Sequence, residues 1–557
     1  MDQQSRLVPR QKRESVILQF DYDCFYAQVL ENKNPSLKSK PLGVKQKNIL
    51  ATCNYNARRL GAKKLMLVSE ALKTCPGLVL VDGEDLTPFR DVSKALFNFL
   101  RSHSWNGRAE KLGFDEVFMD VTDVVDYNIE CLNTNCLRQS FFHLSKKDPE
   151  AGFSCDLTSV AGCVEGKIPD PAPLCNKTYL RLLLGSHLAK FLRSELETKF
   201  GYTSTCGIST NKLLSKLAGA RNKPRNQTTL LALSDDDAVA FVDGHKTRQI
   251  PGIGSRTAML LESHVLGEKV ELESQFSSAL FVREVRQHPS LSPSFLETLL
   301  VGPGAERGVG ARVWGLLHGV DPTEVKMSSN IPSQISIEDT FKGLETLSQI
   351  TEELHKLSCS LIRRMRVDLL ALDHHADVPG TQRWIARPKT LRLSVRSWPA
   401  RQQNHSQAQD FNRVSRSGPL PGFVFDVEGA IDALAEQLVA EALLPLLRRL
   451  PGEKGQKWNL QLINVCVANM VATAADDKQG VGRDISAMFK KQDEVLRPYK
   501  LEPVSDHDDE PLDSDANDEF LSNMEWEHMD RSVCTTCGYC LPLFAMPAHT
   551  RYHEMGG

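Results

Sequence analysis

The chain has 557 residues, which is too many for a single hydrophobic core, so several domains are expected. Apolar residues make up 41% of it, and no apolar run approaches the ~20 residues that span a membrane. The first five residues are polar and lack the apolar core of a signal peptide. Fourteen cysteines, scattered mostly one at a time in apolar surroundings, suit reduced thiols inside a cell. We therefore expect neither a membrane protein nor a secreted one.

Charge is divided unevenly along the chain. The net charge is −3, but residues 501–557 hold thirteen acidic and two basic side chains. The preceding 500 residues therefore hold 65 basic and 57 acidic side chains, a net charge of +8. A mildly basic body with an acidic tail is compatible with local contact to nucleic acid phosphates. Many enzymes carry such a surplus, so it does not by itself identify a partner.

Residues 1–13 are polar, and we expect them to be disordered. Beyond them, two acidic clusters lie in apolar runs. The first cluster spans Phe20–Tyr26, directly after Val16–Leu18, and the second spans Leu112–Asp120. Both apolar runs predict buried strands. A carboxylate costs several kcal/mol to bury alone, so a buried one is normally paired, hydrogen-bonded or bound to a metal ion.

On neighbouring strands, the carboxylates of Asp21, Asp115 and Glu116 would form an oxygen-rich pocket suited to Mg²⁺, with Mn²⁺ as the alternative. Two such ions about 3.5–4 Å apart can activate an attacking hydroxyl and stabilise a leaving phosphate. The pattern therefore predicts phosphoryl or nucleotidyl transfer. Any one of these acids alone could equally face water at a strand end. Asp23 and Asp120 are expected to hydrogen-bond locally rather than to bind the metal.

The residues around these clusters resemble a known family. Phe20–Val29 is similar to the first motif of the Y-family translesion DNA polymerases. The family's further motifs follow in order: Lys40–Val44, Thr52–Arg58, Gly61–Met66, Gly83–Thr87, Gly113–Glu116, Ser209–Ala218 and Ile250–Gly254. The residues within these motifs are most similar to those of the iota branch of the family. The resemblance is close over residues 14–330 and weaker over 331–470.

The resemblance implies an α+β multidomain fold, a right-hand polymerase followed by a tail. It assigns residues 14–24 and 88–216 to the palm, 25–87 to small fingers, 217–325 to a helical thumb, 331–470 to an α/β little finger, 471–530 to an acidic linker and 531–557 to a small Cys2His2 zinc finger. Within the palm, residues 131–178 have little periodicity and are interpreted as a loop insertion. This insertion holds five cysteines but no Cys-x2-Cys pair, so a zinc site is not expected there.

The resemblance also implies roles for individual residues. Asp21, Asp115 and Glu116 would bind the catalytic metal ions, with the Tyr22 carbonyl as a further ligand. The nucleotide would be held by the backbone amides of Cys24, Phe25 and Tyr26 and by the side chains of Tyr55, Arg58 and Lys216. Arginine suits a bidentate phosphate contact, and lysine supplies a point charge. Tyr26 matches the family's steric gate, whose ring lies under the sugar and excludes a 2′-hydroxyl; a core aromatic is the alternative for this residue taken alone.

Four residues match the stretch that forms a roof over the nascent base pair in the iota branch: Gln46, Lys47, Ile49 and Ala51. In that branch a narrow roof favours a template purine turned to its Hoogsteen edge. Ile49 and Ala51 differ from the branch's own apolar residues, so the unusual pairing is left open here.

Two features predict contacts with DNA. Gly252 and Gly254 lie in a helix-hairpin-helix turn, where glycines let the backbone approach a phosphate and helix N-terminal amides can hold it. An ordinary turn between helices is the alternative. In the predicted strand Lys389–Arg396, Arg392 and Arg396 share one face and the apolar residues share the other. Such a strand could grip a DNA backbone, and a solvated basic face is the alternative.

The acidic segment 471–530 is poor in aromatic residues and cannot bury enough surface to fold, so it is expected to be a linker. Within it, Ile485, Met488 and Phe489 are spaced i, i+3, i+4 and form one apolar face. This face resembles a degenerate box for the sliding clamp, PCNA, without the box's usual glutamine. A stray helical turn is the alternative.

The tail predicts a second metal site. Cys534-x2-Cys537 and His549-x3-His553 have the spacing of a Cys2His2 zinc site, and a domain this small would not fold without one. The surrounding residues resemble the ubiquitin-binding zinc finger of the eta branch. However, Arg551 stands where that finger has an aspartate that contacts ubiquitin, so ubiquitin binding is a hypothesis.

Together these observations predict a DNA-templated polymerase that inserts dNTPs opposite damaged bases, by attack of a primer 3′-hydroxyl on the α-phosphate. The expected partners are primer-template DNA, dNTPs, the sliding clamp and ubiquitin, and we expect a monomer in the nucleus. Alternatives are a member of the eta branch, another nucleotidyl chemistry such as a cyclase, and a non-catalytic scaffold that binds ubiquitin or the clamp. The intact set of Asp21, Asp115 and Glu116 argues against a scaffold.

Overall fold

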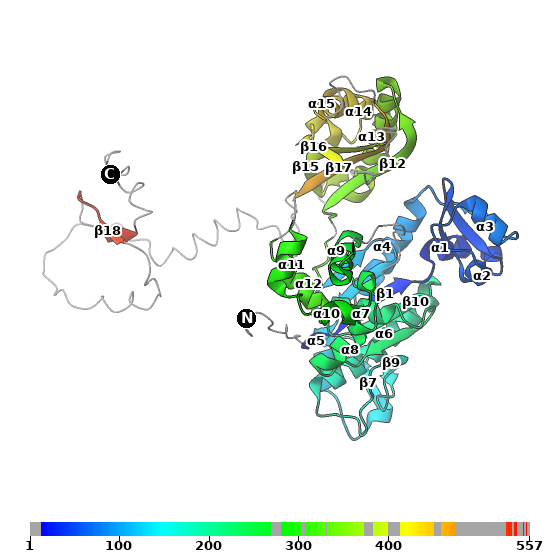
Figure 1. Cartoon of the computed structure of the whole chain (residues 1–557), viewed down its shortest axis with the longest axis vertical. Coiled ribbons are helices and arrows are strands. Elements are labelled where there is room, and N and C mark those ends of the chain that lie inside the picture. Colours follow the sequence, from blue (N-terminus) through cyan, green and yellow to red (C-terminus); the bar gives the residue numbers. More distant parts are fainter. Residues whose placement is uncertain are drawn as a thin grey trace, which may run out of the picture. The chain divides into compact units, whose positions relative to one another are not determined.

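The computed structural model describes residues 13–268, 280–301, 307–329, 331–372, 382–398, 413–450, 458–473, 531–536, 540–542, 550 and 553. The chain forms two compact units, residues 1–335 and 336–557 (Figure 1). None of the helices described could cross a membrane, because none is both long and apolar enough. The expected disordered start, most of the acidic linker, and Ile485, Met488 and Phe489 of the clamp motif lie outside the described residues.

A six-stranded sheet forms the centre of the first unit. Its strand order is β5 (Ala109–Leu112), β6 (Glu116–Asp120), β1 (Ile17–Tyr22), β10 (Ser204–Ser209), β11 (Gln227–Leu230) and β9 (Cys163–Glu165). Strand β1 is antiparallel to both β6 and β10, whereas β10, β11 and β9 are parallel. Both acidic clusters therefore lie on neighbouring strands, as the sequence predicted.

Side chains of β1 alternate between two faces of the sheet. Leu18, Phe20 and Tyr22 lie in the main core, which is shared with α1 (Phe25–Lys33), α4 (Thr87–Arg101), α5 (Thr122–Glu130) and α6 (Lys177–Phe200). The opposite face, which carries Asp21, packs against α7 (Lys212–Gly219). Helix α7 approaches β10 so closely that a Cβ at Gly207 would lie 1.9 Å from the Ser215 carbonyl oxygen. Glycine at position 207 therefore allows α7 to pack closely against the face of the sheet that carries Asp21.

The segment predicted to form the fingers has a small sheet of its own, in the order β3 (Ile49–Cys53), β2 (Leu42–Gln46) and β4 (Val79–Asp82). It is accompanied by the helices η2 (Pro35–Leu37), α2 (Tyr55–Arg59) and α3 (Val68–Thr74). A separate core, which includes Leu50, Cys53 and Ala71, holds these elements together. The assignment of residues 25–87 to fingers stays a prediction, and α1, which lies within that range, packs into the main core with the central sheet.

The insertion at 131–178 is not a loop throughout. It contains η3 (Leu137–Gln139), the hairpin β7 (Ser140–His143) and β8 (Gly152–Cys155), and then β9, which joins the central sheet. Phe142 stacks on Phe153 at 5.1 Å between ring centroids, and Phe153 stacks on Phe191 of α6 at 4.4 Å. Because these aromatic residues are irregularly spaced, the sequence carries no periodic signal for the hairpin.

The segment predicted to form the thumb is helical after β11: it contains α8 (Asp235–Asp243), η4 (Thr247–Gln249), α9 (Ser255–Leu266), α10 (Val282–Arg286), α11 (Pro293–Leu300) and α12 (Val309–Leu317). Strand β11 pairs with β10, so residues 227–230 of the segment predicted as thumb belong to the palm sheet. Gly252 and Gly254 lie between η4 and α9, in the turn that the sequence predicted.

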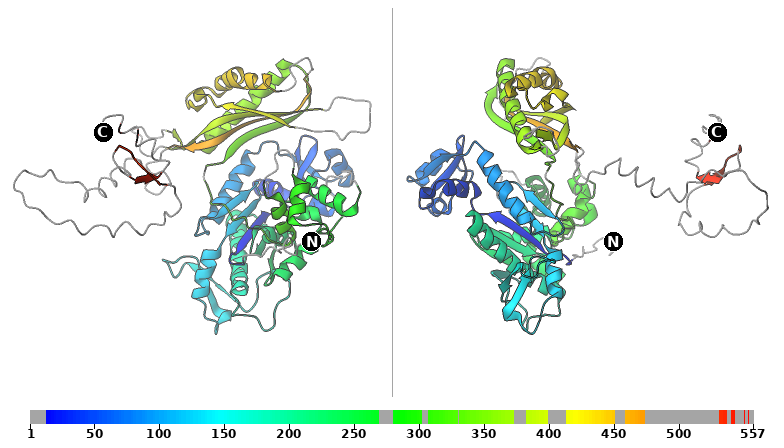
Figure 2. Two further views of the ribbon diagram at one scale, coloured as in Figure 1. Left: turned by 60° about the vertical axis from the view of Figure 1, so that its left-hand side comes forward. Right: turned by 180° about the vertical axis from the view of Figure 1, so that it is seen from behind.

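The second unit has a four-stranded sheet in the order β12 (Gln334–Leu344), β17 (Leu460–Ala472), β15 (Ala386–Ser397) and β16 (Val414–Pro419). It also contains the helices α13 (Leu347–Leu369), η5 (Gly422–Phe425), α14 (Ile431–Leu438), η6 (Val439–Leu443) and α15 (Leu444–Arg448), and the short pair β13 (Leu370–Leu372) and β14 (Gln382–Trp384). The long helices lie over one face of the sheet (Figure 2). In the tail, β18 (Arg531–Val533) pairs with β19 (Cys540–Pro542).

Candidate active site

The register of the central sheet brings the three candidate carboxylates together. Asp21 of β1 is directly opposite Glu116 of β6. Asp115 is the last residue of the turn between β5 and β6, and its carbonyl accepts a hydrogen bond of 2.9 Å from the Tyr22 amide. Gly113 begins this turn with φ +74°, a backbone conformation that L side chains rarely adopt. The strand register therefore places Asp21, Asp115 and Glu116 at neighbouring backbone positions, and their role as metal ligands stays a prediction.

Negative charge is concentrated at this point. Burial, followed by the charges of Asp21 and Glu116, raises the pKa of the Asp115 carboxyl to about 6. Two lysines offset part of the charge: Lys223 Nζ lies 2.6 Å from Asp21 Oδ2, and Lys216 Nζ lies 2.6 Å from Glu116 Oε2. Each lysine occupies one carboxylate, and the ligand atoms of Asp21, Asp115 and Glu116 do not all lie within 4.8 Å of one another. A bound cation would therefore displace one or both lysines, and the oxygen-only donor set fits a hard divalent ion.

A cavity of about 800 Å³ extends from these carboxylates to the fingers. Its fingers side is lined by Ala51, Thr52, Tyr55, Arg58, Ala62, Lys63, Lys64 and Leu65, and Lys223 lines it from the palm. The carboxylates therefore lie at one end of the cavity, and the side chains of Arg58, Lys63 and Lys64 line its walls. This division of charge suits a ligand that carries both phosphates and metal ions.

The turn from β1 into α1 shapes the floor of the cavity. Helix α1 begins at Phe25, so the amides of Phe25 and Tyr26 lie at its N-terminus, where backbone amides can bind an anion. The preceding Cys24 has φ 45°. Asp23 holds this turn, since its carboxylate accepts hydrogen bonds from the Thr203 hydroxyl at 2.9 Å, the Thr205 hydroxyl at 3.0 Å and the Arg225 amide at 2.9 Å. Asp23 thus makes structural hydrogen bonds, but its partners are distant in the sequence rather than local.

Two aromatic side chains frame the cavity. Tyr26 stacks on Phe89, with 4.3 Å between ring centroids, and lies 6.2 Å from the ring of Phe114. Tyr55 lies under the Arg58 guanidinium at 4.8 Å, and Arg58 Nε donates to the Cys53 carbonyl at 3.2 Å. Packing on both sides therefore holds the predicted gate and the predicted phosphate ligands in fixed positions.

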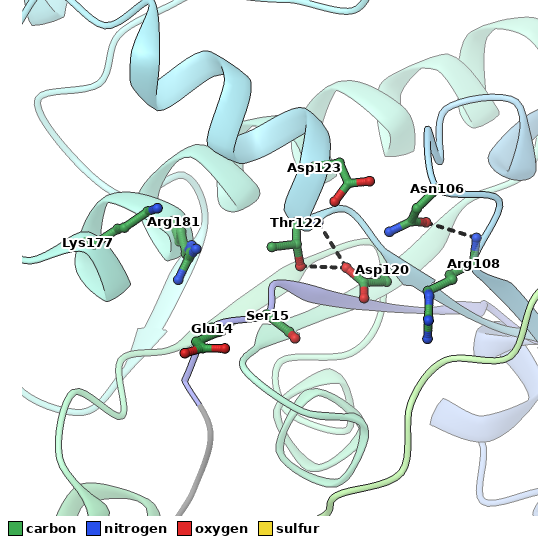
Figure 3. Close-up of a pocket in the computed structure, with 9 residues that line it drawn as sticks. All are labelled: Glu14, Ser15, Asn106, Arg108, Asp120, Thr122, Asp123, Lys177 and Arg181. Atoms are coloured by element: carbon green, nitrogen blue, oxygen red, sulfur yellow. Dashed lines mark hydrogen bonds between the residues drawn. The ribbon is translucent and has the colours of Figure 1, made fainter. Parts of the chain in front are cut away.

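Asp120 lies at the other end of β6, where it pairs with Ile17. It accepts a hydrogen bond from the Thr122 amide at 3.0 Å and lines a separate hollow with Arg108, Lys177 and Arg181 (Figure 3). The register places this hollow away from Asp21, and the expectation that Asp120 hydrogen-bonds locally is confirmed.

Several other predicted site residues lie away from the cavity. Of the four roof residues only Ala51 lines it; Gln46 donates to the Gly83 carbonyl at 2.9 Å, and the Lys47 amide donates to Glu84 Oε1 at 3.0 Å. Lys216, Gly252 and Gly254 line a neighbouring hollow of about 740 Å³ with Lys212, Arg248 and Arg312. Lys223, which the sequence analysis did not name, lines the main cavity instead.

The little-finger strand alternates as predicted. Leu391 and Leu393 are fully buried, while Arg392 and Arg396 on the other face are partly exposed. Arg392 Nη2 also lies 3.3 Å from Cys466 Sγ of β17. The two arginines therefore share one face of β15 within the second unit.

Sequence comparison identifies the family. The sequence model of the impB/mucB/samB family matches residues 20–220, and that of the family's C-terminal domain matches residues 332–480. The two matches cover more than half of the 557 residues. The chain belongs to the impB/mucB/samB family. The Y-family resemblance of its motifs is thereby confirmed.

Individual relatives of this family agree. The chain is 33% identical to DNA polymerase iota of Homo sapiens over 82% of its own length and 52% of that protein. It is 30% identical to DNA polymerase iota of Mus musculus over 95% of its length and 64% of the relative. The Drosophila melanogaster DNA polymerase iota is 33% identical over 66% of the chain and 44% of the relative. The chain thus spans less than two thirds of each of these relatives.

Proposed function

We propose that this chain is a template-directed DNA polymerase of the iota branch, which inserts deoxynucleotides opposite damaged template bases. The observation that carries the proposal is the pairing of Asp21 with Glu116 beside Asp115, at one end of a cavity lined by Tyr55 and Arg58. Three relatives named DNA polymerase iota, at 30–33% identity, favour this branch over the eta branch.

The residues of the cavity would divide the work as follows. Asp21, Asp115 and Glu116, with the Tyr22 carbonyl as a further ligand, would hold Mg²⁺ or Mn²⁺. When bound, such ions activate the primer hydroxyl and neutralise charge on the leaving pyrophosphate. The amides of Cys24, Phe25 and Tyr26 and the side chains of Tyr55 and Arg58 would hold the triphosphate.

The lysines next to the carboxylates would then change partners. Lys223 lines the cavity and Lys216 approaches Glu116 from the neighbouring hollow. If the carboxylates held metal ions, both ammonium groups would be available to the charged substrate. Lys223 would contact the triphosphate from the palm side, and Lys216, the lysine that the sequence motif indicated, would stand beside the metal ligands.

The roof and the DNA contacts are part of the same proposal. Ala51 would lie against the nascent base pair, and Gln46, Lys47 and Ile49 would support the β2–β3 turn beside it. The turn at Gly252 and Gly254 would hold a backbone phosphate at the start of α9, with Arg248 and Arg312 close by. Arg392 and Arg396 of the second unit would add contacts to the DNA backbone.

A primer-extension assay with single nucleotides opposite each template base tests this function. We expect incorporation to require primer, template and a divalent cation together. Template purines that lack N7 should be copied less well than normal purines if the roof favours Hoogsteen pairing. Nucleotide consumption that is equally fast without a primer would instead indicate a cyclase-like reaction and would reject the proposal.

The tail adds a proposed zinc site and two proposed partners. Pairing of β18 with β19 brings Val533 opposite Cys540, and Cys534, the first proposed ligand, is buried. His553 is a described residue, whereas Cys537 and His549 lie outside the described residues. The proposals of Zn²⁺ binding, of ubiquitin binding by this finger and of clamp binding by Ile485, Met488 and Phe489 rest on the sequence motifs. A nuclear, monomeric protein would suit these partners.

Capture of the full chain on immobilised partners tests the tail. Replacing Ile485, Met488 and Phe489 by alanine should abolish capture on the sliding clamp and leave capture on ubiquitin unchanged. Cys537→Ser removes a zinc ligand, so it should abolish capture on ubiquitin and leave capture on the sliding clamp unchanged. Unchanged capture in either matched arm would reject the corresponding partner.

A further inference from the structure

The second unit carries a cluster of three metal-ligating side chains that the polymerase reaction does not use. His355 and Cys359 lie one turn apart on α13, and Asp432 lies in the first turn of α14. One ligand atom of each lies within 4.8 Å of the other two. In the part of the chain that the structure describes, no other three His, Cys, Asp or Glu side chains meet this criterion.

The contacts within the cluster already orient its ligand atoms. The Cys359 thiol donates a hydrogen bond to Asp432 Oδ1 at 3.3 Å, and its sulfur lies 3.9 Å from both ring nitrogens of His355. His355 Nε2 lies 3.3 Å from the Asp432 carbonyl oxygen, to which it can donate. With its proton on Nε2, the imidazole keeps a lone pair on Nδ1 for a metal ion.

The donor set determines which ion would fit. An imidazole nitrogen, a thiolate sulfur and a carboxylate oxygen are the three kinds of ligand that Zn²⁺ binds, whereas Mg²⁺ takes oxygen ligands. Three protein ligands also leave the fourth tetrahedral position to water. We propose that His355, Cys359 and Asp432 form a binding site for Zn²⁺ or a similar divalent transition-metal ion. The ligands of this site differ from the carboxylates of the candidate active site and from the cysteines and histidines of the tail.

Access and proton balance are both consistent with such a site. Cys359 is only 4% exposed, while Asp432 is exposed and His355 partly so, and an ion can therefore enter past the carboxylate. On binding, the S–H bond breaks, a sulfur–metal bond forms, and the proton leaves to solvent. The thiol hydrogen bond to Asp432 is replaced by a carboxylate–metal bond.

The proposed ion would connect parts of the unit that are distant in the sequence. Cys359 and Asp432 are 73 residues apart, and β15 and β16 of the sheet lie in the intervening segment. Because a ligand that binds only the folded state stabilises it, the ion should raise the unfolding temperature of this unit. A thiol–carboxylate hydrogen bond alone would give no metal dependence.

Cobalt binding to the full chain tests the proposal. Co²⁺ is titrated into Cys534→Ser/Cys537→Ser protein, in which the tail motif has lost two ligands, with excess Mg²⁺ present to occupy oxygen-only sites. We expect one bound Co²⁺ with a thiolate-to-cobalt absorption band. Adding Cys359→Ser should abolish the band, and adding Cys466→Ser should not, although Cys466 is also a buried cysteine of this unit.

Asp432→Asn in the same background is a second variant that perturbs folding less, because Asp432 is exposed whereas Cys359 is buried. The variant should lose the band or bind Co²⁺ much more weakly. No thiolate band in the starting protein, or a band that survives both Cys359→Ser and Asp432→Asn, would overturn the proposal.

Discussion

Asp115→Asn is expected to lower primer extension by about a thousandfold, which corresponds to about 4 kcal/mol of lost transition-state stabilisation. Asp115 lies beside both Asp21 and Glu116, and the high pKa of its carboxyl arises from burial and then from their charges. The amide keeps the size of the side chain but removes the negative charge that a divalent ion needs. The measurement is single-turnover incorporation of the correct nucleotide at saturating metal concentration.

The control for this substitution lies on the same strand. Asp120→Asn changes an acid at the far end of β6, where it hydrogen-bonds Thr122 outside the cavity, so its incorporation rate should stay within a fewfold of the parent rate. Binding of primer-template DNA should be unchanged in both variants. Equal losses in the two variants would indicate general damage to the sheet, and full activity of Asp115→Asn would exclude the three-carboxylate site.

The placement of the carboxylates could be predicted from sequence because it depends on local pattern and strand pairing. Two short apolar runs that each carry acids predict neighbouring buried strands, and the observed register needs only that Asp21 pair with Glu116. The same is true of the β15 strand, whose alternation separates Arg392 from Leu391 and Leu393. Asp115 was predicted to lie in a strand, whereas it lies in the turn directly before β6.

Other positions depend on tertiary contacts that no local pattern reports. Lys223 reaches Asp21 because Asp23 accepts the Arg225 amide and so holds the segment after α7 against the palm. Lys216, in a helix that the motif did predict, lies beside Glu116 and outside the main cavity. The clustering of His355, Cys359 and Asp432 likewise depends on how α14 packs against α13, and the i, i+4 spacing on α13 supplies only two of its three members.

Tyr26→Ala is expected to raise the incorporation of ribonucleotides relative to deoxynucleotides by about a hundredfold, within the range that one small group in a shaped pocket can supply. The Tyr26 ring is held by stacking on Phe89 at 4.3 Å and by Phe114 at 6.2 Å, so it cannot readily turn away from a sugar. Removing the ring leaves room for a 2′-hydroxyl. The measurement is the ratio of kcat/KM values for matched ribo- and deoxynucleotides.

Tyr26→Phe separates shape from chemistry at this position. It keeps the ring and its stacking on Phe89 and removes only the hydroxyl, so selectivity should stay near that of the parent. If Tyr26→Phe admitted ribonucleotides as well as Tyr26→Ala does, the hydroxyl and not the ring would select the sugar. If neither variant changed the ratio while both retained activity, Tyr26 would be a core aromatic, which was the alternative that its sequence position left open.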